Sequence, residues 1–424
     1  MNILILGSGG REHTLAWKIL QSPRCKKLFI SPGNGGTEKI AINLKIDIND
    51  FKAVREIIIN NKIEMIVIGP EEPLVNGLTD YLKDESMFSN LIIIGPDKYG
   101  ALLEGSKSYS KEFLKKYDIP TADYFTVDNN NISEGYKFLD KMKKPYVLKA
   151  NGLAAGKGVL IINDLEEAKI QLKEMIFNSK FGEASRKVVI EEFLSGIELS
   201  CFVLTDGKSF KILPMAKDYK RIGEGDTGLN TGGMGAVSPV PFVDNKFLNK
   251  IKTKIISPTL SGLKEEKVVY RGFIFIGLIK VKEEPYVIEY NVRMGDPETE
   301  VVFPRIKGDI VEIFEAIHNQ KLDKVNFDID KRHAATIMLV SGGYPGTHKK
   351  GFEIEISDDI NKSIIFHAGT KISNSGNLVT SGGRVISVTS LADTYNEAIK
   401  RSYETIKKIK FEKMYYRKDI GFDL

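Results

Sequence analysis

The sequence predicts a mixed α/β and α+β chain, and the patterns of three consecutive segments carry this prediction. Residues 1–102 alternate short apolar runs with amphipathic stretches, which is typical of a parallel βαβ domain. Residues 103–326 contain longer apolar runs and hairpin turns, so a central α+β domain is expected, with a small lobe over about residues 120–190. Residues 327–424 are strand-rich and include a predicted helix over about 394–408, which indicates a C-terminal α+β domain.

Four apolar runs in the N-terminal segment are predicted strands. They read NILILG, KKLFIS, EMIVIGP and NLIIIGP, while residues 51–62 and 74–82 have helical spacing. Ligands of such sheets bind beyond the carboxyl ends of the strands. Those ends read GSGGREH, SPGNGG, GPEEP and GPDKYG, and we expect them to line a site.

The first of these ends resembles a dinucleotide fingerprint only in part. Gly7, Gly9 and Gly10 are followed by Arg11 and Glu12, so the third glycine of the fingerprint is absent. The second strand also lacks the acidic residue that would bind a nicotinamide ribose, which argues against such a cofactor. A helix N-terminus with glycine amides and an arginine still suits a smaller phosphate. The alternative for Arg11 is a solvated residue in the first turn.

The glycine-rich loop NGLAAGKGV, residues 151–159, follows a predicted strand. Only three residues separate Gly152 from Gly156, and Gly158 instead of Ser or Thr follows Lys157, so the loop is not a Walker-type phosphate loop. Two interpretations remain open locally. The loop either closes over a different phosphate or is a hairpin loop whose glycines supply positive φ angles.

The stretch PYVIEYNVRMGDPETE, residues 285–300, carries the clearest chemistry. Alternation along a strand places Glu289, Asn291 and Arg293 on one face, and Ile288, Tyr290 and Val292 on the other. A carboxylate and an amide oxygen are hard ligands for Mg²⁺, and the guanidinium could neutralise a transferring phosphoryl group or an acyl oxyanion. The alternative is an internal ion pair between Glu289 and Arg293.

Two further stretches are candidate ligand contacts. In KDYKRIGEGDTGLNTGGMGAVSP, charged residues precede a run of small residues, in which the backbone could approach a ligand closely. The second stretch holds Glu191 and Phe193 at the end of one predicted strand and Glu198 at the start of the next. A strand edge there could give main-chain hydrogen bonds to a purine. A solvated charged loop and a plain hairpin with exposed acids are the respective alternatives.

Composition limits the class of protein. The 61 basic and 56 acidic residues leave a net charge of +5 and are scattered along the chain, which does not favour nucleic-acid binding. The two cysteines exclude a disulfide framework. The apolar runs are far shorter than the roughly 20 residues of a membrane span, and the chain opens on a predicted strand with no cleavable signal. We therefore expect a cytoplasmic protein without a membrane partner.

Together these stretches resemble the ATP-grasp superfamily, in which two α+β lobes clamp ATP. More closely, the chain resembles the glycinamide ribonucleotide synthetase family over its full length. The motifs that carry this resemblance are, in order, GSGGREHTLAWK, SPGNGGT, GPEEPLV, LEGSKSYSKEFL, KANGLAAGKGV, NTGGMGAVSP, MGDPETE, FHAGT, GGRV and YRKDIG. The chain departs from the family at Met294, where a bulkier Phe or Leu is usual, and at Tyr219, where a histidine is expected.

The resemblance implies that glycine, ATP and 5-phosphoribosylamine give glycinamide ribonucleotide, ADP and phosphate, an early step of purine synthesis. It also implies roles for individual residues. The implied ATP contacts are Lys107, Lys149, Gly156, Lys157, Gly158, Glu191, Phe193 and Glu198. The implied ligands of Mg²⁺ or Mn²⁺ are Glu289 and Asn291. The implied substrate contacts are Gly9, Gly10, Arg11, Glu12, Glu71, Asp218, Gly232 and Asp296. The implied catalytic residues are Arg293, Lys220 and Arg221, in a monomer or small homo-oligomer.

Two other functions share parts of this pattern. A carboxylating ATP-grasp ligase of purine synthesis would have the clamp, but should lack GGREH and RMGDPETE together. A non-catalytic nucleotide sensor would keep the fold without needing Glu289, Asn291 and Arg293. Phosphoryl transfer asks mainly for positioning and charge neutralisation, so no Ser-His-Asp or Cys-His arrangement is expected.

Overall fold

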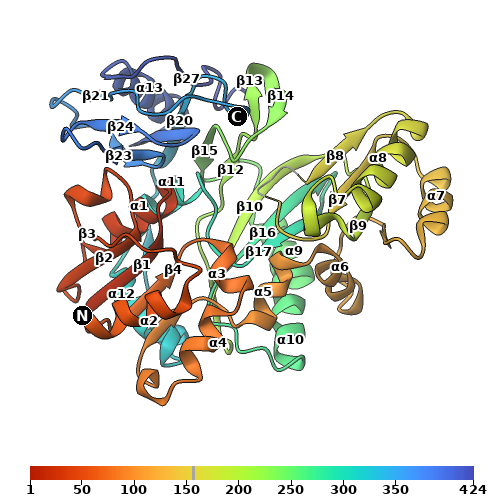
Figure 1. The fold of residues 1–424 in the computed structure, drawn as a ribbon, viewed down its shortest axis with the longest axis horizontal. Coiled ribbons are helices and arrows are strands. Elements are labelled where there is room, and N and C mark those ends of the chain that lie inside the picture. Colours follow the sequence, from red (N-terminus) through yellow and green to blue (C-terminus); the bar gives the residue numbers. More distant parts are fainter. Residues whose placement is uncertain (155–157) are drawn as a thin grey trace.

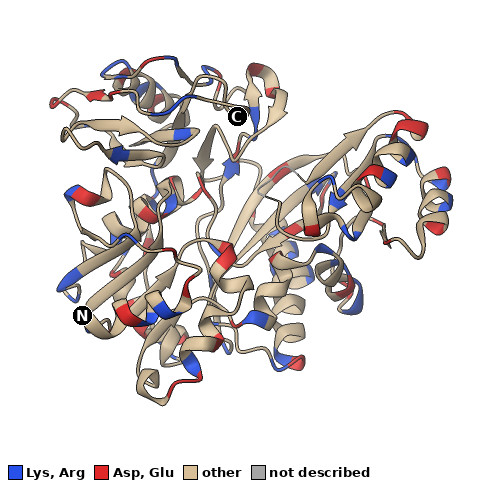
Figure 2. Ribbon diagram, viewed as in Figure 1, with Lys and Arg blue, Asp and Glu red and all other residues tan. Residues whose placement is uncertain are grey.

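The computed structural model describes residues 1–154 and 158–424, arranged as an N-terminal sheet, two central lobes and a C-terminal sheet (Figure 1). Lys and Arg are interspersed with Asp and Glu throughout the molecule (Figure 2), as the scattered charges of the sequence predict. No helix within the described ranges combines the length and apolar character that a membrane span needs.

The N-terminal sheet consists of five parallel strands in the order β3-β2-β1-β4-β5, which confirms the predicted βαβ domain. Its strands are β1 (Asn2–Gly7), β2 (Lys27–Pro32), β3 (Ile42–Asn43), β4 (Met65–Ile68) and β5 (Ile92–Ile94). Its helices are α1 (Gly10–Ile19), α2 (Phe51–Asn60), α3 (Glu71–Val75), α4 (Leu78–Lys83) and α5 (Lys98–Gly105). Leu4 and Leu6 enter one core while Ile3 and Ile5 enter another, so both faces are covered.

One helix prediction in this segment was wrong. Residues 74–82 do not form one helix, because Gly77 between α3 and α4 has a φ of 93°, in the left-handed region. Glycine adopts that conformation without a Cβ clash, and the chain turns there.

The small central lobe is a four-stranded antiparallel sheet covered by helices on one face. Its order is β6-β9-β7-β8, with β6 (Tyr124–Val127), β9 (Val188–Glu192), β7 (Tyr146–Ala150) and β8 (Val159–Ile162). The helices α7 (Ile132–Lys141) and α8 (Leu165–Phe177) pack on it. Their core includes Leu139, Leu148 and Leu172, which are fully buried.

The large central lobe is a second antiparallel sheet, in the order β11-β10-β16-β17. Its strands are β11 (Phe210–Ile212), β10 (Ile197–Thr205), β16 (Gly272–Val281) and β17 (Glu284–Asn291). The helices of this region are α6 (Lys107–Lys116), α9 (Asn245–Ile251) and α10 (Ser257–Glu265), the last two joined by a π-helical turn over Lys252–Ile256.

The C-terminal sheet takes strands from two segments of the chain. Its order is β12-β15-β20-β25-β22, and β27 also pairs with β20. The strands β12 (Lys217–Asp218) and β15 (Gly235–Ser238) come from the central segment, and β20 (His333–Ser341), β25 (Arg384–Ala392), β22 (Ile364–His367) and β27 (Met414–Tyr415) follow it. Residues on both sides of position 326 therefore share one sheet. The terminal helix α13 (Tyr395–Ile406), which was predicted over about 394–408, packs on this sheet.

Shorter elements complete the structure. The helices α11 (Thr299–Val302) and α12 (Ile310–His318) pack against the N-terminal sheet and its helices. A hairpin of β13 (Arg221–Gly223) and β14 (Thr227–Asn230) projects beside the C-terminal sheet (Figure 1). Three two-stranded pairs remain: β18 (Ile306–Lys307) with β19 (Asp328–Ile329), β21 (Glu355–Ile356) with β26 (Ile409–Lys410), and β23 (Thr370–Ile372) with β24 (Leu378–Thr380).

Candidate functional site

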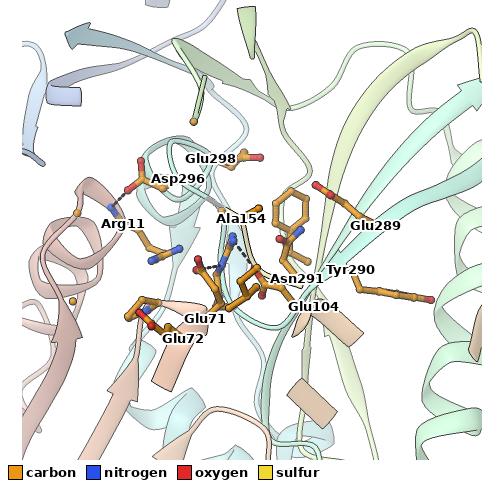
Figure 3. A pocket seen from close by; sticks show the side chains of 18 of the residues that line it. Arg11, Glu71, Glu72, Glu104, Ala154, Glu289, Tyr290, Asn291, Asp296 and Glu298 are labelled. Atoms are coloured by element: carbon orange, nitrogen blue, oxygen red, sulfur yellow. Dashed lines mark hydrogen bonds and ion pairs between the residues drawn. The ribbon is translucent and has the colours of Figure 1, made fainter. Parts of the chain in front are cut away.

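A cavity of about 740 Å³ lies where the N-terminal sheet, the two central lobes and the C-terminal sheet meet. Figure 3 shows Arg11 and Asp296 on one side of it and Glu289 and Asn291 on the other. The predicted site residues that line the cavity are Gly9, Arg11, Glu12, Glu71, Lys107, Lys149, Gly158, Glu191, Asp218, Lys220, Gly232, Glu289, Asn291, Arg293 and Asp296. Segments distant in sequence thus contribute to one site.

Four predicted site residues are not brought to the cavity wall. Gly10 is packed beneath the buried Glu300 side chain, and Phe193 lies beyond the end of β9 with 40% of its surface exposed. Glu198 is in an ion pair with Lys220, described below. Arg221 was expected to be catalytic, but the β13–β14 pairing directs its guanidinium to the carbonyl of Gly228, at 2.8 Å. Gly156 and Lys157 lie outside the described residues.

The strand β17 presents the predicted metal ligands to the cavity, but its alternation is interrupted. Gly277 pairs with Glu289 and Leu278 with Val287, so Ile288 is the extra residue of a β-bulge. Ile288 was predicted on the core face. It instead lines the cavity, as Glu289 does, because the bulge shifts the alternation by one residue.

Glu289 and Asn291 form a donor set that fits a hard divalent cation. One carboxylate and one amide oxygen face the cavity, and the Asn291 Nδ2 atom is buried without a hydrogen-bond partner among the described residues. Mg²⁺ typically takes one or two protein oxygens and completes its shell with water and phosphate. The alternative interpretation, an ion pair between Glu289 and Arg293, is wrong, because Arg293 pairs elsewhere.

Arg293 is held by two carboxylates from the N-terminal half of the chain. Its Nη2 atom donates to Glu104 at 2.6 Å and its Nε atom to Glu71 at 3.2 Å. The second Glu104 oxygen accepts the Val292 N–H at 2.8 Å, which fixes the carboxylate under the guanidinium. Sequence reasoning missed Glu104, although it stands in the motif LEGSKSYSKEFL.

Burial and the neighbouring arginines give Glu104 and Glu71 different pKa values. Burial raises the pKa of Glu104 to about 7, although Arg293 opposes the shift. Burial alone would also raise the pKa of Glu71, but Arg293 and Arg11 outweigh it, and the pKa of Glu71 lies below its ordinary value. The pair therefore offers one readily protonated carboxyl and one firmly ionised carboxylate beside the same guanidinium.

The N-terminus of α1 differs from the predicted phosphate site. Glu12 accepts the Gly9 N–H at 2.6 Å, and Asp296 accepts the Arg11 N–H at 3.0 Å, so carboxylates occupy two of the amides expected to bind phosphate. The Arg11 guanidinium donates to Glu12 at 2.6 Å and to the carbonyl of Met294 at 3.0 Å. Arg11 is only 9% exposed, and the alternative of a solvated first-turn residue is wrong.

Arg384, which the sequence prediction did not include, joins the C-terminal sheet to this region. Its guanidinium pairs with the Asp296 carboxylate at 2.9 Å, donates to the Asp296 carbonyl at 2.6 Å, and also donates to the carbonyl of Gly232. Burial disfavours the ionised form of Asp296, but Arg384 and Arg11 outweigh this and lower its pKa. The motif GGRV, which contains Arg384, was the available signal.

The small lobe contributes a lysine–glutamate cluster. Lys149 and Lys111 each donate to the Glu191 Oε2 atom at 2.9 Å. Glu191 has strand partners on both sides, Tyr124 and Val147, so the prediction of a sheet edge is wrong at this residue, whereas the main-chain contact with a purine at the end of the strand stays a prediction. Lys107 lies nearby and donates to the carbonyl of Gly152 at 3.4 Å, and burial lowers its pKa.

A second cluster surrounds the start of the β13–β14 hairpin. Lys220 donates to the Oε2 atom of Glu198 at 2.7 Å, and the contact of Glu198 with ribose stays a prediction. Burial raises the pKa of Asp218, and burial together with the Asp218 carboxylate raises the pKa of Glu298 to about 7. Glu298, another residue missed from sequence, accepts the Ser200 hydroxyl at 2.9 Å and lines the cavity.

Tyr219, the departure from the resembled family, does not face the cavity. Its side chain is 1% exposed in the C-terminal core, and its hydroxyl donates to Asp423 at 2.9 Å. The neighbours Asp218 and Lys220 line the cavity because they lie on the opposite face of the chain.

Three family models together match most of the chain. They are phosphoribosylglycinamide synthetase, N domain, over residues 1–104, its ATP-grasp (A) domain over residues 105–299, and its C domain over residues 334–423. The chain is 42% identical over 421 residues to phosphoribosylamine–glycine ligase from Caldanaerobacter subterraneus subsp. tengcongensis, covering 99% of each chain. It is 43% identical over 429 residues to the ligase of that name from Vibrio vulnificus, covering 100% of this chain and 98% of the relative.

Solved structures give the same relationship. The crystal structure of phosphoribosylamine–glycine ligase from Thermotoga maritima has a TM-score of 0.86 and 36% identity, covering 99% of this chain and 100% of that chain. The biotin carboxylase domain of Hydrogenobacter thermophilus 2-oxoglutarate carboxylase, solved with MgADP, has a TM-score of 0.72 at 16% identity, covering 98% and 91% of the chains, and shares the fold alone. On the full-length matches, this chain belongs to the phosphoribosylglycinamide synthetase family, with its N, ATP-grasp and C domains.

Proposed function

We propose that the protein ligates glycine to 5-phosphoribosylamine at the expense of ATP, giving glycinamide ribonucleotide, ADP and phosphate in purine biosynthesis. One observation carries the proposal: Lys149 from the small lobe, Glu289 from the large lobe and Arg11 from the N-terminal domain line one cavity. Ligation requires a triphosphate, a carboxylate substrate and a phosphosugar amine to meet in one site, and this cavity brings the three parts together. Relatives that this chain matches over nearly their full length are named phosphoribosylamine–glycine ligase.

The chemistry has two steps. A glycine carboxylate oxygen attacks the γ-phosphorus of ATP, and ADP leaves, which gives glycyl phosphate. The amine nitrogen of phosphoribosylamine then attacks the acyl carbon, loses a proton and expels phosphate. Both steps ask mainly for positioning and for neutralisation of negative charge.

The ATP subsite is proposed between the two central lobes. Lys107 and Lys149 would contact the phosphates, with the backbone at Gly158 beside them. Glu289 and Asn291 would hold Mg²⁺ or Mn²⁺, which when bound supplies positive charge to the β- and γ-phosphates. Both residues line the cavity.

The acyl and sugar subsites are proposed on the N-terminal side. Arg293 and Lys220 supply cationic donors for the charge that develops on the acyl phosphate. The ammonium of glycine is a cation, and Asp218 beside Lys220 is a carboxylate that can receive it. The proposed contacts of phosphoribosylamine are Gly9, Arg11, Glu12, Glu71, Gly232 and Asp296. We also propose domain limits of 1–102, 103–326 and 327–424, with β12 and β15 of the middle segment contributing to the sheet of the C-terminal domain.

The proposal is tested by measuring whether ADP release requires glycine as the phosphoryl acceptor. With phosphoribosylamine present, ADP release should require glycine, and bicarbonate should not replace it. ADP release driven by bicarbonate would indicate a carboxylating ATP-grasp enzyme instead. Nucleotide binding without turnover under any of these conditions would indicate a sensor.

A further inference from the structure

Lys111, a buried lysine on α6, shares the Glu191 carboxylate with Lys149. We infer that Lys111 is a positioning residue that neutralises Glu191, and thereby leaves the charge of Lys149 available to the phosphates of a bound nucleotide. The inference rests on the proposed ATP site and goes beyond it, because Lys111 itself does not line the cavity.

The geometry of the three side chains is that of a shared carboxylate. Both ammonium groups lie 2.9 Å from the same atom, Oε2 of Glu191. The side chains of Lys111, Lys149 and Glu191 are 3%, 8% and 5% exposed, so water screens these charges little. Lys149 and Glu191 line the cavity, whereas Lys111 lies behind them.

Lys111 is fixed in this place by further contacts. Its ammonium also donates to the Thr121 hydroxyl at 2.7 Å, and that hydroxyl donates to the Val287 carbonyl at 2.7 Å. The ammonium lies 5.8 Å from the centre of the Tyr124 ring, within the range of a cation–π contact. The position of Lys111 is therefore set by protein groups and does not depend on a ligand.

The net charge of Lys111, Lys149 and Glu191 determines what Lys111 contributes. Two lysines and one glutamate leave one net positive charge, and that charge faces the cavity through Lys149. Without Lys111, the buried Glu191 carboxylate would have Lys149 as its remaining partner among these groups. Lys149 could then approach a phosphate only by leaving a buried carboxylate unpaired, which is costly. The lysines also hold the pKa of Glu191 below its ordinary value against the effect of burial, so the carboxylate is ionised when nucleotide binds.

Calorimetric titration with ADP in the presence of magnesium measures this effect without requiring ligation. Lys111→Met should raise the Kd of ADP by roughly 10- to 100-fold, the range for loss of one charge-assisted interaction. Lys111→Arg, which keeps the charge, should bind ADP nearly as the wild type does. In turnover assays Lys111→Met should raise the KM of ATP and leave the KM of glycine unchanged.

Lys116 provides a matched control on the same helix. It pairs with Glu266 at 2.9 Å, the same separation as in the Lys111 pair, but its side chain is 54% exposed. Lys116→Met should leave the Kd of ADP within about twofold of wild type, since exposed ion pairs contribute little. An equal loss of affinity in both variants would overturn the inference.

A double variant separates electrostatic positioning from simple structural support. If Lys111 acts by neutralising Glu191, then adding Lys111→Met to Glu191→Gln should cause no further loss of ADP affinity. An equal cost of Lys111→Met in the presence and absence of Glu191 would overturn the inference. The comparison of Glu191→Gln with the double variant stands even if Lys111→Met alone does not fold. Wild-type protein that binds no ADP would instead contradict the proposed function.

Discussion

Arg293 donates to Glu104, to Glu71 and to the carbonyl of Met294, and these contacts decide what its loss should do. We predict that Arg293→Ala lowers turnover by about 10² to 10³, the usual cost of losing one transition-state donor. The Glu71 carboxylate, which Arg11 also stabilises, would add to the loss by repelling the acyl phosphate, whereas the pKa of Glu104 would rise further without Arg293. Steady-state ADP release with saturating glycine measures the effect.

A matched arginine outside the cavity serves as the control. Arg55 pairs with Glu85 at 2.7 Å, a separation close to that of the Arg293–Glu104 pair, but it is partly exposed and does not line the cavity. Arg55→Ala should keep near-normal turnover. Near-normal turnover in Arg293→Ala would remove Arg293 from its assigned role.

Glu104 makes the stability of the protein depend on pH near neutrality. Its pKa rises from an ordinary value of 4.5 to about 7 on folding, so between these values the folded state holds a proton that the unfolded state has lost. This contribution to stability is complete below pH 4.5 and is lost as the pH rises through 7. Glu104→Gln keeps a neutral side chain at all pH values and lacks the dependence.

The expected outcome is a change in the difference between the two proteins. The free energy of unfolding of Glu104→Gln minus that of the wild type should increase by up to about 3 kcal/mol from pH 4.5 to pH 8. Urea denaturation at both pH values measures this. A difference independent of pH would show that the carboxyl titrates near its ordinary value.

At the scale of single elements, α1 links the N-terminal sheet to the C-terminal one. The His13 Nδ1 atom accepts the His367 N–H of β22 at 2.8 Å, and the two rings lie 5.5 Å apart. Asn34 adds a second link, since its amide donates to the carbonyls of Ser8 and His367 at 2.9 and 2.8 Å. The loop before α1, which lines the cavity, is therefore braced by the C-terminal sheet.

His13→Gln tests this brace. Burial lowers the pKa of His13 from 6.5 to about 4, so in that range the unfolded state binds a proton that the folded state does not. The wild type should lose stability as the pH falls from 6.5 to 4, while the glutamine variant does not titrate there. At pH 7.5 the variant should be less stable by roughly 1 to 3 kcal/mol, because the buried His367 amide loses its matched acceptor.

The difference in the free energy of unfolding between the wild type and His13→Gln should become smaller towards pH 4.5. Thermal or urea unfolding at the two pH values gives the measurement. His348→Gln is the control, since that ring bonds locally to the Gly346 carbonyl at 2.9 Å and joins no two sheets. A stability difference that stays constant with pH would contradict a neutral, buried His13.

The elements also show how far sequence patterns reach. Four strands of the N-terminal sheet were predicted from their apolar runs, whereas β3 was missed because it has only two residues, Ile42–Asn43. Alternation placed Glu289 and Asn291 on the cavity side of β17, but misplaced Ile288. Nothing in the local residue types marks the bulge, which arises from the register of β17 against β16.

Contacts between distant residues were beyond local pattern altogether. Glu104 and Arg293 are 189 positions apart, and Arg384 and Asp296 are 88 apart. The amides of α1 looked free for phosphate because Asp296, which accepts one of them, follows 285 positions later. Charge type at a position could be read from the sequence, but the partner that neutralises it depends on how the lobes pack.

At the scale of the whole molecule, the cavity depends on every part of the chain. Arg384 of the C-terminal sheet holds Asp296, Asp296 holds the first turn of α1, and Glu104 holds Arg293 beside the large lobe. A site distributed in this way explains why family motifs occur from the first strand to the last segment. It also predicts that a ligand bound between the lobes will stabilise the molecule as a unit.

Binding of ADP with magnesium should therefore raise the stability of the protein. At a free ligand concentration of 100 times the Kd, linkage gives about 2.7 kcal/mol, seen as a higher unfolding temperature. Chelation of the metal should remove part of this gain, because the proposed ligands Glu289 and Asn291 would then face the phosphates directly. Glu289→Gln should bind metal-free ADP at least as well as the wild type, yet show little further gain on addition of magnesium.

Glu284 offers the matched control for that experiment within the same strand. Its carboxylate pairs with Lys250 and Lys254, both at 2.7 Å, and does not line the cavity. Glu284→Gln should keep the full gain from magnesium, since the metal would be bound by oxygens at the other end of β17. If Glu289→Gln also keeps the full gain, the metal binds elsewhere, and the pairing of the two central lobes around a metal–nucleotide complex must be abandoned.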